Sequence, residues 1–345
     1  MLAYYFLTLS AIFGIGISSF IEKLPVEKKF NTILLYFLYI LTTLISGFRF
    51  QTGGDWQTYE FWYESFEFDS IFTSGVEPGW VLYTLVVKYL GVNFNGYLLI
   101  TAIISNILIF YSLKKLVNNR ILAIIGICFY CFISFYSIQM FYIRSGMAAG
   151  LFMLSIWLWE TNKLKALATI LLSLSIHQAI IIALTLYAVT RIFLFNRLFL
   201  LLAYIFLYIL FFYIINQYAP DAYVSGNFSE IRELGLKQVI GGILLLTIIY
   251  KMDFLKRKYS KPVISISILC FVIPYLFDSY EVGSRVRLFY SSFDGVALAL
   301  VLSSLMEKKY ISFGLLLFAL GFIYIFWSNP YTQSIYIPYK TWFFD

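Results

Sequence analysis

Charge is scarce in this sequence, and it is nearly absent from the long stretches between short polar segments. Charged residues make up only 12% of the chain, against 61% for hydrophobic residues. A soluble domain is about half apolar and about a quarter charged, and the mean hydropathy here is +0.83. The composition therefore excludes an ordinary soluble protein and predicts helices that face lipid or one another.

Cysteine and histidine are also rare, with three cysteines and one histidine. Cys128, Cys131 and Cys270 all lie inside apolar runs and are interpreted as small core residues. Cys128 and Cys131 have CxxC spacing, but no second pair accompanies them, which disfavours a redox or metal site.

Several motifs of soluble chemistry are missing altogether. The absence of a P-loop and of GxSxG argues against ATP use and a serine-hydrolase site. Without a DxD or similar carboxylate pair there is no evident Mg²⁺ seat. The net charge of +7 is not gathered on a polar domain, so nucleic acid is not an expected partner. We expect neither a metal nor a cofactor.

What fills the chain is a series of apolar segments. A spanning helix needs about 20 apolar residues, so roughly ten spans use up most of the 345 residues. The first twenty residues lack a basic n-region and a small-residue cleavage site, which indicates a first span and not a cleaved signal. The predicted fold class is an all-α polytopic membrane bundle of about 10–11 spans with short re-entrant or interfacial helices, forming one domain over 1–345.

Lysine and arginine gather in six short clusters, which the positive-inside rule places on the cytoplasmic side. The clusters are Lys23, Lys28 and Lys29; Lys114, Lys115 and Arg120; Lys163 and Lys165; Arg191 and Arg197; Lys251, Lys256, Arg257, Lys258 and Lys261; and Lys308 and Lys309. The predicted spans are then 30–47, 96–113, 121–141, 145–160, 198–215, 238–250, 263–278, 287–306 and 310–327, with outer loops at 48–78 and 216–237. Residues 79–91 are too short to span, and both termini lie outside.

Residues 166–190 do not fit a simple count. They lie between two basic clusters but are too few for two spans. We predict a broken hairpin that dips into the membrane and returns, with its break near Ser175, Ile176 and His177. Such breaks are tolerated where they pack in protein or line a cavity. The alternative is one full span, with Arg191 and Arg197 outside.

The predicted outer ends collect ionisable and polar residues, which are functional candidates by default because they are costly near spans. They are Arg49, Asp55, Glu77, Gln139, Arg144, His177, Asp278, Glu281, Arg285 and Arg287. Four arginines on one membrane face suit a strongly anionic ligand, since guanidinium groups bind phosphate oxygens in two-point contacts.

Each candidate also has a simpler structural interpretation. These are a surface ion pair for Arg49 and Asp55, an interfacial aromatic belt for Trp56, Tyr59, Trp62 and Tyr63, a helix start for Glu77, snorkelling for Arg144, a hydrogen-bonded core position for His177, and headgroup anchors for Arg285 and Arg287. Against them, Gly53 and Gly54 allow backbone N–H groups to approach a ligand closely. The aromatic side chains are also suited to stacking on sugar rings.

Together these residues resemble the EpsG/Wzy family of polysaccharide polymerases. The resemblance rests on five ordered motifs: GFRFQTGGDWQTY at 47–59, EPGW at 77–80, YIRSGMA at 142–148, SLSIHQA at 173–179 and GSRVRLFY at 283–290. They extend over nearly the whole chain. In that family an arginine and a G-D-x-x-x-Y motif follow the second span and a lone histidine lies in a later span, as they do here.

The resemblance implies a GT-C-like glycosyltransferase of the bacterial inner membrane. Such an enzyme transfers a growing undecaprenyl-pyrophosphate-linked glycan onto the non-reducing end of a new lipid-linked repeat unit, on the outer face. Its partners would be that lipid-linked oligosaccharide, the bilayer, a chain-length regulator and a flippase.

We assign hypothetical roles on this basis. Asp55 is the favoured general base and His177 the second candidate; Arg285 and Arg287 bind the leaving pyrophosphate, with Arg144 assisting. Arg49 holds the acceptor's pyrophosphate or orients Asp55, and Tyr59 and Glu77 contact substrate. Three other classes remain open: a flippase or transporter of lipid-linked sugar, a glycan ligase, and a membrane O-acyltransferase.

Overall fold

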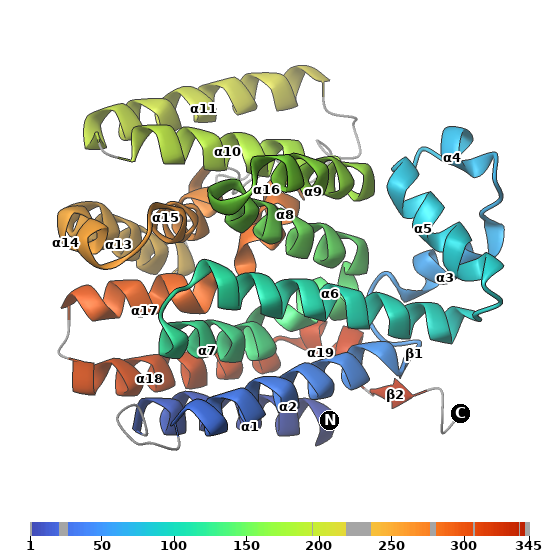
Figure 1. The fold of residues 1–345 in the computed structure, drawn as a ribbon, viewed down its shortest axis with the longest axis horizontal. Helices are drawn as coiled ribbons and strands as arrows, with labels where there is room; N and C mark the ends of the chain where they lie inside the picture. The colour runs from blue at the N-terminus through green and yellow to red at the C-terminus, as the bar shows by residue number, and fades with distance from the viewer. Residues whose placement is uncertain are drawn as a thin grey trace.

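The structure is a computed structural model that describes residues 2–20, 27–194, 196–218, 236–276, 281–305, 308–337 and 339–341. The described residues form helices and connections, apart from two strands of two residues each, so the predicted all-α class is confirmed (Figure 1). Lys23, Asp278 and most of the predicted outer loop 216–237 lie outside the described residues, as do the side chains of Glu281, Lys308 and Lys309.

Most of the helices lie side by side along one axis, and Figure 1 shows them running across the view. Their bounds are α1 Leu2–Phe20, α2 Glu27–Gly47, α3 Trp56–Ser65, α4 Ser70–Thr73, α5 Pro78–Tyr89, α6 Phe94–Leu116, α7 Arg120–Phe129, α8 Ile143–Thr161, α9 Lys163–Ile176, α10 Ile180–Phe193, α11 Arg197–Tyr218, α13 Leu236–Tyr250, α14 Met252–Lys258, α15 Lys261–Leu276, α16 Glu281–Ser291, α17 Asp294–Leu305, α18 Lys308–Ser328 and α19 Pro330–Tyr336. The strands are β1 Arg49–Phe50 and β2 Lys340–Thr341.

By length and composition, α2 and α6 can each cross a membrane, and the bent pair α16–α17 adds a third candidate span. Shorter apolar helices of 10–17 residues occupy most of the other predicted spans. Helix α7 is buried from Leu122 to Phe129 and packs against α1, α6 and α17, whereas α11 at the edge of Figure 1 exposes large apolar side chains. A buried apolar centre and an apolar outer surface fit a polytopic membrane protein.

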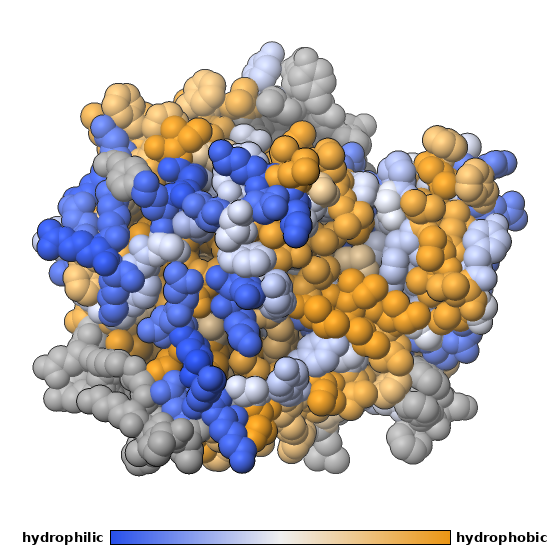
Figure 2. Space-filling view, in the orientation of Figure 1, coloured by the Kyte–Doolittle hydropathy of each residue, from blue (hydrophilic) through white to orange (hydrophobic). Residues whose placement is uncertain are grey.

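The bundle has two chemically different ends. One carries α3, α4, α5, β1 and β2, which we call the loop end (Figure 1). At the other, the basic end, residues of three predicted clusters (Lys115, Arg191 and Lys261) line one pocket, and Arg197 pairs with Asp253 of α14 at 2.6 Å. Hydrophilic side chains gather on that side of Figure 2. Residues of three of the six predicted basic clusters therefore lie at one end.

The segment 166–190 breaks where the sequence predicts. Helix α9 ends at Ile176, α10 begins at Ile180, and His177 lies in the connection between them. At the far end of α10, Arg191 Nη2 lies 2.8 Å from Glu160 Oε1, just before the start of α9. The chain therefore returns to the end from which it left, which agrees with the dip-and-return prediction and not with one straight span.

Two predicted spans differ from simple helices. Residues 130–141 widen into π-helical turns, η1 Tyr130–Ser134 and η2 Tyr136–Phe141. The predicted span 287–306 is instead bent by 63° between α16 and α17. Gly295 at the start of α17 packs directly against Phe129, so the bend brings α17 onto the central helix. The π-helical turns have no local signal in their apolar run, whereas the bend falls at Ser292, Asp294 and Gly295, residue types that often interrupt a helix.

The π-helical turns help to hold the loop end in place. The backbone carbonyl of Gln139 accepts a hydrogen bond from Arg49 Nη1 at 2.9 Å, and that of Tyr136 accepts one from the Tyr336 hydroxyl at 3.1 Å. Strand β1 pairs antiparallel with β2, Arg49 opposite Thr341 and Phe50 opposite Lys340. Arg49 and Tyr336, which are far apart in the sequence, thus both donate hydrogen bonds to backbone carbonyls of the π-helical segment. A π-bulge interrupts the regular α-helical hydrogen-bond pattern.

Gly53 packs so closely against the π-helical segment that a side chain has no room at this position. Its φ is +100°, and a Cβ at this position would overlap the carbonyl oxygen of Met140. Gly75 also has a positive φ, +71°, but no described atom lies within 4 Å of its Cβ position. The two glycines therefore share a backbone requirement and differ in their surroundings.

We expect Gly53→Ala to lower the melting temperature of the purified protein clearly more than Gly75→Ala does. Both variants carry the left-handed backbone penalty, roughly 1 kcal/mol, and only the first adds overpacking of about 1–3 kcal/mol. Thermal unfolding in detergent measures both. Equal losses would show that the contact with Met140 carries no weight.

Candidate functional site

The carboxylate of Glu77 is the centre of a polar cluster at the loop end. Glu77 immediately precedes α5, with Pro78 in the first helical turn, and its backbone carbonyl accepts bonds from Trp80 and Val81. Its side chain makes no capping hydrogen bond. The carboxylate instead turns away from its own helix, so a helix start alone does not account for this glutamate.

Glu77 joins two other segments of the chain. Its Oε2 forms an ion pair with Nη1 of Arg144, in the first turn of α8. Its Oε1 accepts a hydrogen bond from the Gln178 backbone amide at 3.0 Å and lies 3.4 Å from Nδ1 of His177. The exposed fractions of the Glu77, Arg144 and His177 side chains are 11%, 14% and 5%, so the three groups interact in a largely water-excluded setting.

Close packing of α5 on α9 makes this geometry possible. A Cβ at Gly79 would overlap Ser175, so the glycine of EPGW lets the first turn of α5 reach the end of α9. Ser173 of α9 in turn donates to the carbonyl oxygen of Ala148 in α8 at 2.8 Å. Small residues at helix contacts allow such approach, and here they bring Glu77 to the α9–α10 break.

An aromatic wall from α3 borders the cluster. The Arg144 guanidinium carbon lies 5.3 Å from the ring centroid of Trp62, within cation–π range. The Tyr59 ring packs edge-on against Trp62 at 5.5 Å. Burial raises the pKa of the Tyr59 hydroxyl, and the nearby positive charge of Arg144 opposes that rise. Tyr59 therefore remains a neutral hydrogen-bonding group beside the arginine.

Two further aromatic residues of α3 are core residues, whereas Phe61 is 65% exposed. Trp56 and Tyr63 are buried, and both pack against Phe94 of α6. Their rings are therefore already in use within the fold and do not form an interfacial belt. Trp62 is the partly exposed ring that also contacts a charged group of the cluster, which makes it the aromatic side chain best placed to meet a sugar.

The two arginines of α16 have different surroundings. Arg285 is partly exposed and lies within electrostatic range of His177, as does Arg144. The ring of Phe289 packs edge-on against the imidazole at 5.5 Å, which fixes α16 beside the histidine. Arg287 points elsewhere and pairs with Asp294 at 2.6 Å across the α16–α17 bend. The structure therefore places Arg285, and not Arg287, with the Glu77 cluster.

Arg49 and Asp55 do not form the surface ion pair that the sequence leaves open. Arg49 is fully buried, and burial lowers the pKa of its guanidinium to about 10. Its Nη1 donates a hydrogen bond to the Gln139 carbonyl at 2.9 Å. Asp55 is partly exposed at the start of α3, without a side-chain capping bond, and its charge acts on Tyr59. Their substrate roles stay predictions.

A protein-family model matches residues 32–341 of this chain, which is nearly its full length. The chain belongs to the EpsG family. This family is associated with membrane proteins of exopolysaccharide biosynthesis, which confirms the resemblance seen in the sequence. No curated protein and no solved structure matches the chain.

Two features of the cluster could not be read from the motifs. The carboxylate partner of His177 lies a hundred positions upstream in EPGW, whereas the sequence offers no acid in the histidine's own segment. The Arg144–Trp62 contact likewise joins two motifs far apart in the chain. The sequence did predict that Glu77, Arg144 and His177 all lie at the outer ends of membrane spans, which was the one indication that they come together. Within the described residues, no group of three His, Cys, Asp or Glu side chains is arranged to hold a metal ion.

The Glu77–Arg144 pair should be strongly coupled. We expect Glu77→Gln and Arg144→Gln each to destabilise the protein by about 3 kcal/mol, because each leaves a buried charge unpaired. The double variant should lose much less than the sum of the two, and a double-mutant cycle of thermal unfolding measures the difference.

Arg197 and Asp253 provide the matched control cycle. They pair at 2.6 Å, but their side chains are 43% and 70% exposed. Arg197→Gln and Asp253→Asn should therefore show a coupling of at most about 1 kcal/mol. A coupling no larger for Glu77 and Arg144 would contradict a water-excluded interaction.

Proposed function

We propose that this chain is a polysaccharide repeat-unit polymerase of the bacterial inner membrane, with its loop end on the outer side. The observation that carries the proposal is the Glu77 carboxylate held between Arg144 and His177, beside Trp62. Membership of the EpsG family and the basic residues at the opposite end support the chemistry and the orientation.

The proposed reaction joins two lipid-linked glycans. A hydroxyl at the non-reducing end of a new repeat unit attacks C1 of the reducing-end sugar of the growing chain. The new bond forms between that oxygen and C1, while the bond from C1 to the pyrophosphate oxygen breaks. The hydroxyl proton passes to a base of the protein, and undecaprenyl pyrophosphate leaves with the bonding electron pair.

We assign the base to His177 rather than to Asp55 in this proposal. A neutral imidazole that accepts a proton becomes a cation, and the Glu77 carboxylate 3.4 Å from Nδ1 is placed to stabilise it. The same carboxylate and the edge of Phe289 hold the ring in one orientation. A positioned general base contributes typically about 10²–10⁴-fold to a rate. Asp55 remains the alternative base, acting from the start of α3.

Leaving-group stabilisation falls to Arg285 in this proposal, with Arg144 assisting. Burial of His177 and the positive charges of both arginines oppose its protonation, so a bound pyrophosphate that balances these charges would make the imidazole a stronger base. Preorganised cations in a water-excluded site stabilise the developing charge most effectively. The charge of Arg287 is already balanced by Asp294, and Arg49 is enclosed at the Gln139 carbonyl, so we give both supporting roles in the framework of the site.

Loss of the gene should stop chain growth but not the synthesis of repeat units. In a deletion strain of the native host we expect the ladder of surface glycan to collapse to a single repeat unit on its carrier. Gel analysis of that glycan measures the outcome. Complete loss of surface glycan would point to a flippase or a ligase instead, and an intact ladder of altered mass to an acyltransferase.

Substitutions in the cluster should separate chemistry from folding. We expect His177→Ala and Arg285→Ala each to lower the polymerisation rate by about 10²–10⁴-fold at normal protein level, since each removes a group that acts on the transition state. The readout is polymer length and amount in a complemented deletion strain. Arg197→Gln at the basic end serves as control and should polymerise normally. Normal chain length in His177→Ala would assign the base to another residue, with Asp55→Asn as the next variant to measure.

A further inference from the structure

Two broken helices meet beside the Glu77 cluster. One is the α9–α10 hairpin, which has His177 at its break, and the other is the bent pair α16–α17. Near the end of α16, the ring of Phe289 packs against the imidazole of His177. The hydroxyl of the next residue, Tyr290, donates a hydrogen bond to the Ala183 carbonyl of α10. Helix α16 is therefore the part of the second broken helix that contacts the proposed base.

Helix α16 presents different residues to the site and to the bend. Because residues four positions apart on an α-helix lie on the same face, Arg285 and Phe289 share the face that meets His177. Arg287 comes two positions after Arg285 and lies on another face. There it forms its ion pair with Asp294, in the first turn of α17.

The Arg287–Asp294 pair favours the bent arrangement over a straight helix. Seven residues of a straight α-helix rise about 10.5 Å, whereas across the 63° bend Nη2 of Arg287 lies 2.6 Å from Oδ2 of Asp294. A carboxylate in the first turn of a helix also interacts favourably with the helix dipole. The pair therefore holds the angle between α16 and α17.

The corner of the bend is fixed to the centre of the bundle. Gly295, just after the corner, packs directly against Phe129 of α7. The carbonyl of Ser291, just before the corner, accepts a hydrogen bond from the Ser134 hydroxyl at 2.6 Å. With the corner held in place, a change of angle would swing α16 about it and move its site-facing residues relative to His177.

As a stabilising contact the pair is modest. The side chains of Arg287 and Asp294 are 27% and 18% exposed, and Nη1 of Arg287 has no hydrogen-bond partner among the described residues. A buried ion pair stabilises a protein only when its geometry is good and its remaining polar groups are satisfied. Loss of this pair should therefore affect the geometry of the bend more than the stability of the bundle.

We propose that Arg287 and Asp294 are positioning residues, which fix the α16–α17 bend and so keep Arg285 and Phe289 against His177. This role rests on the proposed function, in which His177 accepts the hydroxyl proton and Arg285 stabilises the leaving pyrophosphate. The charge of Arg287 then serves the geometry of the site and does not contact substrate.

The first test removes the pair and largely keeps its volume. Arg287→Met/Asp294→Leu replaces both charges by apolar side chains, an exchange that is often neutral or stabilising. We expect an unchanged or higher melting temperature in detergent, but a kcat about 10²-fold lower on purified lipid-linked repeat units, because a displacement of about 1 Å can cost that much. KM should change little, since Arg285 acts on the transition state. A normal kcat, or a melting temperature that falls together with it, would overturn the positioning role.

The second readout does not depend on polymerase activity. His177 is the only histidine of the chain, so its imidazole can be followed by NMR without overlap in protein purified without a histidine tag. Its signals should shift in Arg287→Met/Asp294→Leu, because Phe289 moves, and return toward those of the wild type in Arg287→Lys/Asp294→Glu, which keeps both charges. Unmoved signals would overturn the proposal. Shifted signals together with a wild-type protein that makes no polymer would instead support the positioning of His177 and overturn the proposed function.

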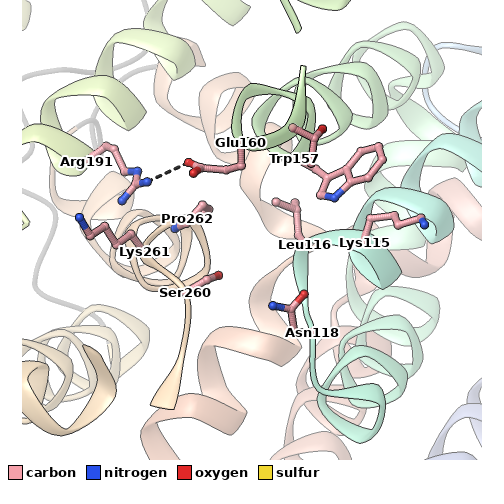
Figure 3. Close-up of a pocket in the computed structure, with 10 residues that line it drawn as sticks. Lys115, Leu116, Asn118, Trp157, Glu160, Arg191, Ser260, Lys261 and Pro262 are labelled. Carbon is pink, nitrogen blue, oxygen red and sulfur yellow. Dashed lines mark hydrogen bonds and ion pairs between the residues drawn. The ribbon is translucent and has the colours of Figure 1, made fainter. Parts of the chain in front are cut away.

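The matched control is Arg191→Met/Glu160→Leu. This ion pair, drawn as a dashed line in Figure 3, measures 2.8 Å, and its side chains are 25% and 44% exposed. It borders the pocket of about 430 Å³ at the basic end, at the opposite end of α10 from His177. The control should leave kcat and the imidazole signals unchanged. An equal effect would mean that loss of any ion pair suffices and would overturn the specific role of the bend.

Discussion

The loop end depends on one buried carboxylate. Glu77 must be satisfied by Arg144, His177 and the Gln178 amide at once. Removing a carboxylate and a guanidinium from water is expensive, and their attraction offsets this only when geometry and hydrogen bonds are good. The start of α5, the first turn of α8 and the α9–α10 break are therefore fixed relative to one another. Small shifts of any of these three segments would leave a charge buried without a partner.

The same constraint explains why the chain breaks at His177. A continuous helix through residues 163–193 would keep the amide of Gln178 within its own hydrogen-bond ladder. The break releases that amide to the Glu77 carboxylate, at 3.0 Å. Irregular backbone in a membrane protein is tolerated where protein groups satisfy it. Glu77 thus stabilises the break, and the break holds the imidazole against Phe289 and within reach of Arg285.

Sequence reasoning reached those features that have a local signal. The long apolar segments predicted the helices, and the clusters of lysine and arginine predicted a common basic end. The short length of segment 166–190 predicted the broken hairpin. The burial of Arg49 escaped it because its partner is a backbone carbonyl ninety residues away, and carbonyls carry no sequence signature. The π-helical turns were not predicted for a related reason, whereas the 63° bend lies at a stretch with two serines, an aspartate and a glycine that the sequence analysis passed over. In an apolar run such as residues 121–141, every helix face looks alike, so only packing decides where the helix widens.

Three of the four arginines predicted on one membrane face have clearly different surroundings in the fold. Arg49 is held by a carbonyl and surrounded by tyrosines, and Arg287 is balanced by Asp294. Arg144 forms an ion pair with Glu77, and its guanidinium group lies over the ring of Trp62. Its charge is therefore balanced and its orientation is fixed. In the proposed reaction, a pyrophosphate that drew Arg144 away from Glu77 would leave the carboxylate with His177 and the Gln178 amide. Under the proposed function, this exchange of partners would strengthen the contact between Glu77 and His177 on which a histidine base depends.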